Sequence, residues 1–179
     1  MQILRILRNY GIKATFFITG DSVEQYPKIL RALVSDGHTI GNHTWNHLDI
    51  TTISQDVLKE EILSLNKLLK NFTDQDIRLF RPPYGAIDEE SYRSILEFGL
   101  LPILWDLDTL DWDFTRTEPI DERVSRKLKQ QNIILMHDGG GPREKTVQAL
   151  PRIIDHLMQQ GYEFLTITEY FRRVYQKYV

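Results

Sequence analysis

The feature that most constrains the fold is an apolar run near the start of the chain. Residues 14–19, Ala-Thr-Phe-Phe-Ile-Thr, are rich in β-branched and aromatic side chains, and Gly11 and Gly20 bound them. A near-continuous apolar run of this length is typical of a strand that is buried on both faces, as in a parallel sheet. Parallel strands need a long crossover between them, usually a helix. The run therefore predicts a protein of the α/β class.

The rest of the chain alternates helical and strand-like segments. Apolar residues at helical spacing, with capping residues, predict helices over residues 3–9, 21–35, 54–69, 88–98, 121–130, 146–160 and 168–177. Short apolar runs predict further strands over residues 37–40, 79–80, 101–107, 133–136 and 163–166. The alternation predicts a parallel sheet with helices outside, closed or nearly closed into a barrel of β/α units.

Polar segments follow four of the expected strands. They are residues 43–47, 81–84, 106–112 and 137–138. In a parallel barrel the C-terminal ends of the strands gather at one rim, so we expect the four segments to meet there. The prolines of the second segment forbid regular structure and predict a rigid loop.

The first of these segments contains two histidines at a spacing that suits a metal ion. His43 and His47 lie four residues apart in Gly-Asn-His-Thr-Trp-Asn-His, residues 41–47. In one helical turn or a tight loop, this spacing brings both rings to one side. Neutral imidazole is the commonest protein ligand for zinc and similar ions. The spacing alone is a weak indication, because such a pair also arises by chance.

Composition narrows the class of partner. The 179 residues are 41% hydrophobic, which suits one globular domain with a full core, and their net charge is -3. That charge gives no electrostatic case for binding nucleic acid. The absence of cysteine excludes disulfides and thiolate chemistry. No run approaches the roughly 20 apolar residues of a transmembrane segment, and the first residues lack the features of a signal peptide.

Each candidate residue also has an ordinary structural interpretation. Arg81 could be a surface arginine and Asp111 a loop cap. Trp112 could be a lid over the core, and His137 a structural histidine at a strand end. Together, however, these segments include most of the groups that metal-assisted hydrolysis needs. They contain imidazole ligands, a further histidine as acid, a carboxylate to orient that histidine, and amides that could face an oxyanion.

Five motifs carry a resemblance to a known family. They are residues 11–20, residues 41–47, Arg-Pro-Pro-Tyr-Gly (81–85), Asp-Thr-Leu-Asp-Trp (108–112) and Ile-Leu-Met-His-Asp (134–138). In this order they resemble the polysaccharide deacetylases, carbohydrate esterase family 4, which contain the NodB homology domain. The likeness covers essentially the whole chain. It implies a distorted (β/α) barrel that removes acetate from an N-acetylglucosamine polysaccharide, such as peptidoglycan, chitin or an exopolysaccharide, in the cell envelope or outside the cell.

The resemblance implies a metal-binding half of the site. By this likeness His43 and His47 are metal ligands, most often for Zn²⁺, with Co²⁺ or Ni²⁺ as alternatives. Arg81 steers the catalytic base, and the backbone N–H of Tyr84 helps to hold the oxyanion.

The resemblance also implies an acid half of the site. By the same likeness Asp111 orients His137 and tunes its pKa, and His137 protonates the leaving amine. Trp112 and Leu135 line the small pocket for the methyl group of the acetyl.

One family motif does not occur among the 179 residues. The family opens with a strand that ends in Thr-Phe-Asp-Asp-Gly, whose first aspartate is the general base and whose second is the third metal ligand. Neither the base nor the third ligand is found in this chain. Asp49, Asp106 and Asp108 are carboxylates that could substitute, and the sequence gives no reason to prefer one. We therefore expect a single domain over residues 1–179 that is incomplete at its N-terminus and lacks the first barrel strand.

Two interpretations of this difference stay open. Either the sequence is a truncated reading of a longer enzyme, or it is a degenerate relative that binds carbohydrate or metal without catalysis. A purely structural barrel is a third interpretation, against which the five motifs argue. An open sheet edge favours pairing with another chain. We expect the 179 residues alone to be poorly soluble or oligomeric and nearly inactive.

Overall fold

The computed structural model describes residues 1–175. The chain forms two compact units. Unit 1 comprises Met1–Ile12 and Trp105–Phe164, and unit 2 comprises Lys13–Leu104 and the C-terminal residues from Leu165. Both units contain parallel strands connected by helices, which confirms the predicted α/β class.

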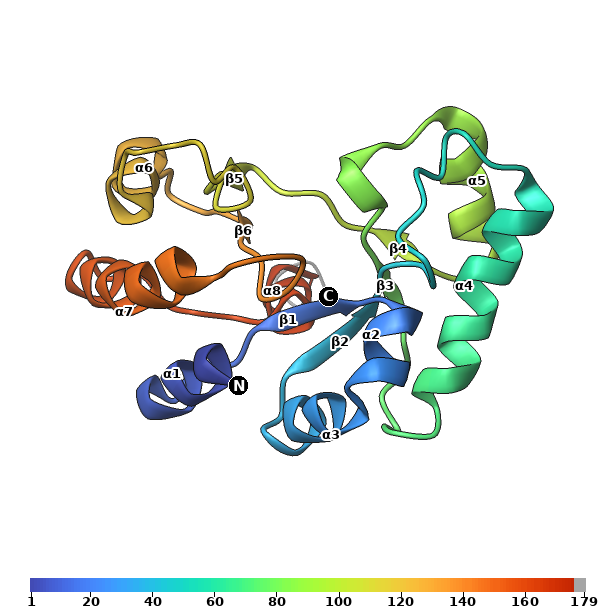
Figure 1. Cartoon of the computed structure of the whole chain (residues 1–179), viewed down its shortest axis with the longest axis horizontal. Coiled ribbons are helices and arrows are strands. Elements are labelled where there is room, and N and C mark those ends of the chain that lie inside the picture. Colours follow the sequence, from blue (N-terminus) through green and yellow to red (C-terminus); the bar gives the residue numbers. More distant parts are fainter. Residues whose placement is uncertain (176–179) are drawn as a thin grey trace. The chain divides into compact units, whose positions relative to one another are not determined.

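Unit 2 is built on a four-stranded parallel sheet in the order β1-β2-β3-β4 (Figure 1). The strands are β1 (Thr15–Ile18), β2 (Thr39–Asn42), β3 (Leu79–Phe80) and β4 (Leu101–Pro102). Strands that are consecutive in the chain are also neighbours in the sheet. Because all pairs are parallel, the C-terminal ends of β2 and β3 lie next to each other, with Asn42 opposite Phe80.

The helices of unit 2 make the crossovers between its strands. They are α2 (Gly20–Gln25), α3 (Pro27–Ser35), α4 (Gln55–Leu69) and α5 (Glu89–Glu97), followed near the C-terminus by α8 (Ile167–Tyr175). The Ser54 side chain caps α4 by accepting the N–H of Val57. The core between α4, α5 and the sheet consists of Ile50, Leu58, Ile62, Phe80, Ile95 and Leu100.

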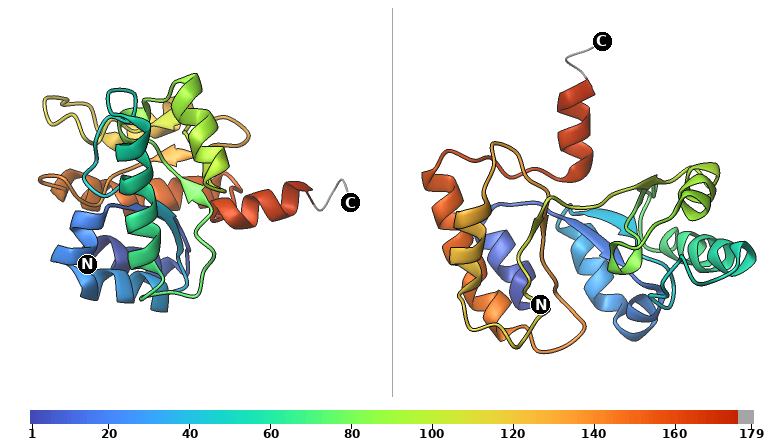
Figure 2. Two further views of the ribbon diagram at one scale, coloured as in Figure 1. Left: turned by 90° about the vertical axis from the view of Figure 1, so that its right-hand side faces the viewer. Right: turned by 90° about the horizontal axis from the view of Figure 1, so that it is seen from above.

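Unit 1 contains a pair of short parallel strands and three helices. The strands are β5 (Leu107–Asp108) and β6 (Ile134–Leu135). Helices α1 (Gln2–Tyr10), α6 (Ile120–Lys127) and α7 (Glu144–Gln159) pack side by side (Figure 2). Its core consists of Leu107, Ile120, Val124, Ala149, Ile153 and Leu157.

The parallel sheets are open rather than closed into a barrel. Within residues 1–175, β1 and β4 are the edges of the larger sheet, and β5 and β6 pair with each other. The helices and parallel strands are those of a β/α protein, as the sequence predicts. The single-domain interpretation, and the pairing of chains through an open edge, stay predictions.

The helix predicted over residues 21–35 is wrong in one respect, because it is two helices. The chain leaves helical geometry at Tyr26, with φ -131° and ψ 53°, and Pro27 begins α3. A residue before proline is disfavoured in the α region by contact with the proline ring. Pro27 is tolerated as the first residue of the second helix, because an N–H at that position would have no acceptor within the helix.

Two strand predictions are also wrong. The segment 101–107 divides into β4 and the start of β5, which belong to different sheets. Pro102 has no N–H to donate and occupies an edge strand, after which the chain leaves the sheet. Residues 163–166 form no strand, because Thr166 and Glu169 exchange hydrogen bonds that cap α8. Residues 176–177 of the helix predicted there lie outside the described part of the chain.

The loop predicted at 81–85 contains a short regular turn. Pro83–Gly85 form a 3-10 helix, η1, with Tyr84 at φ 60°.

Among residues 1–175, no helix has the length and apolar character of a membrane span.

Replacement of a core leucine on α4 tests the packing of unit 2. Leu58 is 0% exposed and Leu63, on the same helix, is 40% exposed. We expect Leu58→Ala to lower the free energy of unfolding by about 2–5 kcal/mol, because it leaves a cavity in the core. The same change at Leu63 should cost less than about 0.5 kcal/mol in urea unfolding. Equal effects at the two positions would contradict this packing.

Candidate functional site

The histidine loop, residues 43–47, begins where the hydrogen-bond ladder of unit 2 ends. His43 donates its backbone N–H to the carbonyl of Ile18 at 3.0 Å, and Arg81 donates its N–H to the carbonyl of Asn42 at 2.9 Å. These bonds continue the β1-β2 and β2-β3 pairings by one residue. They fix His43 and Arg81 side by side at the C-terminal edge of the sheet.

A backbone carbonyl fixes the tautomer of His43. Its Nδ1 lies 2.6 Å from the carbonyl oxygen of Arg81. A carbonyl oxygen only accepts hydrogen bonds, so Nδ1 must carry the proton. The neutral ring then has its lone pair on Nε2, the nitrogen with which it can bind a metal ion. Orientation of this kind by a backbone carbonyl is usual for histidines that bind metals.

Three aromatic rings from two loops lie together, those of His43, His47 and Tyr84. The rings of His43 and His47 meet edge to face, with centroids 4.8 Å apart and an interplanar angle of 82°. The Tyr84 ring contacts His47 in the same way, at 4.8 Å and 80°. The predicted approach of the two imidazoles is therefore present in unit 2.

Buried His38, which precedes β2, shows the opposite chemistry. Its Nδ1 accepts the backbone N–H of Ala14 at 3.1 Å, so Nδ1 has the lone pair and the ring is neutral. His38 therefore serves the start of β1, whereas the partner of His43 leaves that ring in the tautomer that suits a metal.

The two loops of this site contain unusual backbone conformations. Thr44, His47 and Tyr84 have φ of 63°, 57° and 60°. Residues with a Cβ rarely adopt this left-handed region, and each such residue costs on the order of 1–3 kcal/mol. Such conformations persist only where surrounding contacts impose them, which indicates that the loops are held in place.

Arg81 is a buried cation between the sheet and the chain after β4. Its guanidinium donates to the carbonyls of Ile103 at 3.2 Å and Leu104 at 3.3 Å, and lies 4.2 Å from the centre of the Phe17 ring. Gly41 leaves room for that ring, since a Cβ there would lie 2.6 Å from it. Burial lowers the pKa of Arg81 to about 10, so the group stays charged at neutral pH. It is not the surface arginine of the ordinary interpretation.

Unit 1 brings Asp111 and His137 together. Asp111 Oδ1 accepts from His137 Nδ1 at 2.7 Å, and Oδ2 accepts the backbone N–H of His137 at 2.9 Å and the hydroxyl of Thr146 at 3.0 Å. Burial opposes ionisation of the Asp111 carboxyl. The hydrogen bonds and the charge of His137 more than offset it, so the pKa of Asp111 lies below its usual value. This carboxylate orients the His137 ring.

The strands β5 and β6 hold the loop that contains Asp111. Thr109 donates its hydroxyl to the carbonyl of Leu135 at 2.8 Å. Asp108 accepts the N–H of Leu110 at 2.7 Å and the indole N–H of Trp112 at 3.3 Å. Leu135 is buried, whereas Trp112 is half exposed beside the Asp111 backbone.

Arg143 was not among the sequence candidates, although it bridges both loops of this half-site. It donates to the carbonyls of Asp111 at 3.1 Å, Gly139 at 2.7 Å and Gly140 at 3.3 Å. Thr146, which bonds Asp111, was also missed. The only sequence indication of either residue is its position just after the glycine run 139–141.

Among residues 1–175, no third metal-binding side chain accompanies the histidine pair. No group of three or more His, Asp or Glu side chains in this described part of the chain could hold an ion. Asp49 instead accepts the N–H and hydroxyl of Thr51. Asp106 accepts the N–H of Ile133 in unit 1. This part of the chain thus provides two of the ligands that a metal ion needs, and both are imidazoles of suitable chemistry.

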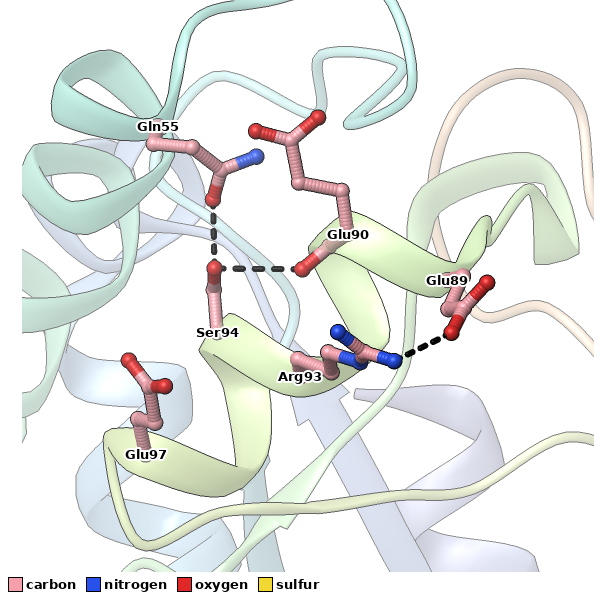
Figure 3. A pocket seen from close by; sticks show the side chains of 6 residues that line it. All are labelled: Gln55, Glu89, Glu90, Arg93, Ser94 and Glu97. Atoms are coloured by element: carbon pink, nitrogen blue, oxygen red, sulfur yellow. Dashed lines mark hydrogen bonds and ion pairs between the residues drawn. The ribbon is translucent and has the colours of Figure 1, made fainter.

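A shallow hollow elsewhere in unit 2 is not part of the site. It has a volume of about 420 Å³ and lies between the start of α4 and α5 (Figure 3). Its polar groups bond one another, since Ser94 donates to Gln55 at 2.5 Å and Arg93 pairs with Glu89. The residues that line it are Gln55, Glu89, Glu90, Arg93, Ser94 and Glu97.

The predicted site residues thus occur in two groups. Unit 2 brings together His43, His47, Arg81 and Tyr84. Unit 1 brings together Asp111, Trp112, Leu135 and His137. The meeting of all four polar segments at one rim stays a prediction.

The chain is similar in sequence to known deacetylases. A family model described as polysaccharide deacetylase matches residues 1–103. A peptidoglycan-N-acetylglucosamine deacetylase from Bacillus cereus is 38% identical over 173 residues, which are 96% of this chain and 81% of the relative. A chitooligosaccharide deacetylase from Azorhizobium caulinodans is 31% identical over 172 residues, covering 89% of this chain and 82% of the relative.

A solved structure of a pseudoenzyme is also similar. This member of carbohydrate esterase family 4 from Bacillus anthracis has a TM-score of 0.85 and 34% identity. The match covers 94% of this chain and 58% of that one. A mutant of the pseudoenzyme with restored enzymatic activity matches with a TM-score of 0.86.

Neutralising Asp111 tests the ionic character of the acid pair. Because the pKa of Asp111 is lower in the folded than in the unfolded chain, its ionisation stabilises the fold above its unfolded pKa of about 3.9. That stabilisation is lost as the pH falls through the lower folded pKa. We expect Asp111→Asn to reduce the free energy of unfolding by about 1–3 kcal/mol at about pH 7, and by less at about pH 3.

Exposed Asp74 provides the matched control for this measurement. Asp74→Asn should leave urea unfolding nearly unchanged at both pH values, because its carboxyl is already in water. A deficit of Asp111→Asn that does not shrink in acid would contradict the stabilising role of the charged carboxylate.

Proposed function

The chain belongs to the polysaccharide deacetylase family, carbohydrate esterase family 4, and from this membership we propose that it removes acetate from N-acetylglucosamine residues of a polysaccharide. The reaction is a hydrolysis, in which the oxygen of a water molecule forms a new C–O bond, the amide C–N bond breaks and the sugar nitrogen takes up a proton. The products are acetate and a free amine on the sugar. We favour peptidoglycan as the substrate, because the B. cereus relative is a peptidoglycan-N-acetylglucosamine deacetylase. Chitin and an exopolysaccharide are the alternatives. Such a substrate implies work in the cell envelope or outside the cell.

The Asp111–His137 pair is the observation that carries this proposal. An amide nitrogen leaves poorly as an anion, so it must receive a proton as the C–N bond breaks. The Asp111 carboxylate accepts from Nδ1 of His137 at 2.7 Å, which leaves Nε2 to give that proton. The His137 side chain is 35% exposed, so a substrate can approach the ring.

The residues of unit 2 have the chemistry that an amide carbonyl needs as negative charge develops on its oxygen. Tyr84 is the second residue of η1, where a backbone N–H has no acceptor within the turn. We propose that this N–H donates to the oxygen on which negative charge develops. Buried Arg81 provides positive charge and orients His43 through its own carbonyl. In unit 1, Trp112 and Leu135 are proposed to bound the pocket for the acetyl methyl.

His43 and His47 are the proposed metal ligands. Deacetylases of this family are generally metal-dependent, and a bound divalent ion supplies Lewis-acid polarisation of the amide carbonyl. The tautomer of His43 and the approach of the two rings support the assignment. Zn²⁺ is the ion we propose, because imidazole suits it well, and Co²⁺ and Ni²⁺ accept the same ligands.

A second candidate function is binding without catalysis. The observation that favours it is the absence of a third His, Asp or Glu beside the histidine pair among residues 1–175. A pseudoenzyme of known structure in the same family provides a precedent. Under this alternative the chain would retain carbohydrate or metal and release no acetate.

Titration with Zn²⁺ tests the ligand pair. We expect His43→Ala to weaken Zn²⁺ binding by about tenfold or more relative to the wild type, because one of two imidazoles is lost. His156→Ala on α7 is the matched control, since it removes a histidine of unit 1 that takes no part in the proposal. Equal affinity of the wild type and His43→Ala would refute the ligand assignment.

Acetate release from a chitooligosaccharide separates the enzyme from the binding module. We expect slow but metal-dependent release, which His137→Gln reduces by about tenfold or more because the proton donor is lost. Sugar binding, measured by calorimetry, should change little in this variant. Binding by the wild type with no acetate above background would support the non-catalytic alternative.

A further inference from the structure

Helix α4 contacts the residue before each proposed ligand. Asn42 precedes His43, and Asn46 precedes His47. Hydrogen bonds from both asparagines reach residues 61–66 of α4, which runs beside β2 (Figure 1). One short stretch of α4 therefore holds both ends of the histidine loop.

Asn42 forms the connection at the start of the loop. Its amide donates to the carbonyl of Ile62 at 2.9 Å and to the side-chain oxygen of Asn66 at 2.8 Å. Its own side-chain oxygen accepts the N–H of Thr44 at 2.9 Å. Asn42 is 0% exposed, so its three hydrogen bonds are protected from water.

Glu61 forms the connection at the end of the loop. One carboxylate oxygen accepts the backbone N–H of Asn46 at 2.8 Å, and the other accepts the side-chain amide of the same residue at 2.5 Å. Glu61 is only 6% exposed, although it is a carboxylate on an amphipathic helix. Burial of such a group is unfavourable without strong hydrogen bonds, which Asn46 supplies.

The backbone at His47, directly after Asn46, requires a contact such as the one between Glu61 and Asn46. His47 has φ 57°, a conformation that surrounding interactions must impose. Helix α2 fixes the middle of the loop, because Gly20 and Asp21 donate their N–H groups to the carbonyls of Thr44 and Trp45, each at 3.2 Å. Glu61 fixes the residue directly before His47.

We propose that Glu61 is a positioning residue for His47, which sets the orientation of the second ligand by holding both donors of Asn46. This inference rests on the proposed metal-binding function of the histidine pair. Two acceptor atoms on a short, buried side chain match two donors on one residue, so the arrangement fixes Asn46 in position and in rotation. Neither Glu61 nor Asn46 is a predicted metal ligand or proton donor.

Donor and acceptor matching provides a rescue experiment. In Asn46→Asp two carboxylates face each other, so the side-chain hydrogen bond is replaced by repulsion. In the double variant Asn46→Asp/Glu61→Gln, the new glutamine amide can donate to the new carboxylate, and the glutamine oxygen can still accept the backbone N–H. The pair is restored with its polarity reversed and its total charge unchanged.

Titration with Ni²⁺ or Zn²⁺ is the functional measurement. We expect Asn46→Asp and Glu61→Ala each to weaken binding by about 10- to 100-fold, the usual effect of losing a group that orients a ligand. The double variant should bind within about threefold of the wild type. Glu60→Ala, which removes an exposed carboxylate from the same turn, should bind as the wild type does.

Hydrogen exchange of the Asn46 backbone amide gives a readout that needs no metal. We expect it to be slow in the wild type and the double variant and faster in Asn46→Asp and Glu61→Ala. If the wild type binds metal no better than His43→Ala, the proposed function fails, and this exchange pattern alone decides whether Glu61 holds the loop. Single variants that bind and exchange like the wild type, or a double variant as impaired as the single ones, would overturn the proposal.

Discussion

The hydrogen-bond ladder of the four-stranded sheet positions His43 and Arg81 in unit 2. It runs one residue past the strands, so that the N–H of Arg81 bonds the carbonyl of Asn42 and the N–H of His43 bonds that of Ile18. The Arg81 carbonyl then accepts the Nδ1 proton of His43. Strand pairing thereby determines which nitrogen of the imidazole carries its lone pair. A property of one side chain follows from the register of the sheet.

Strained backbone marks the loops of both half-sites. Among residues 1–175, the four residues other than glycine with positive φ are Thr44, His47, Tyr84 and Leu110. Each lies in a loop directly after a parallel strand, where a function that needs fixed side chains can be supported. The support comes from polar groups, with buried Glu61 and Asn42 at the histidine loop, and with buried Thr146 and partly exposed Arg143 at the acid loop. Their hydrogen bonds offset the strain locally.

The sequence predicted the α/β class and the pairing of His43 with His47 and of Asp111 with His137, but not all of the element boundaries. His43, His47, Asp111 and His137 stand in short motifs, so their spacing could be interpreted without knowledge of the fold. Their supports could not be predicted in this way, because Glu61 lies 15 residues from Asn46 and Arg143 lies 32 residues from Asp111. The errors had local causes. Pro27 divided one helix, and the Thr166–Glu169 pair capped α8 where apolar residues had favoured a strand.

The tautomer of His43 can be measured in solution, and strand pairing determines it while metal binding requires it. Long-range ¹H–¹⁵N correlation spectra of the imidazole rings distinguish the two neutral tautomers. We predict that His43 is protonated at Nδ1 without metal, and that added Zn²⁺ shifts the Nε2 resonance. A His43 ring protonated at Nε2, or an Nε2 resonance that Zn²⁺ does not change, would contradict it.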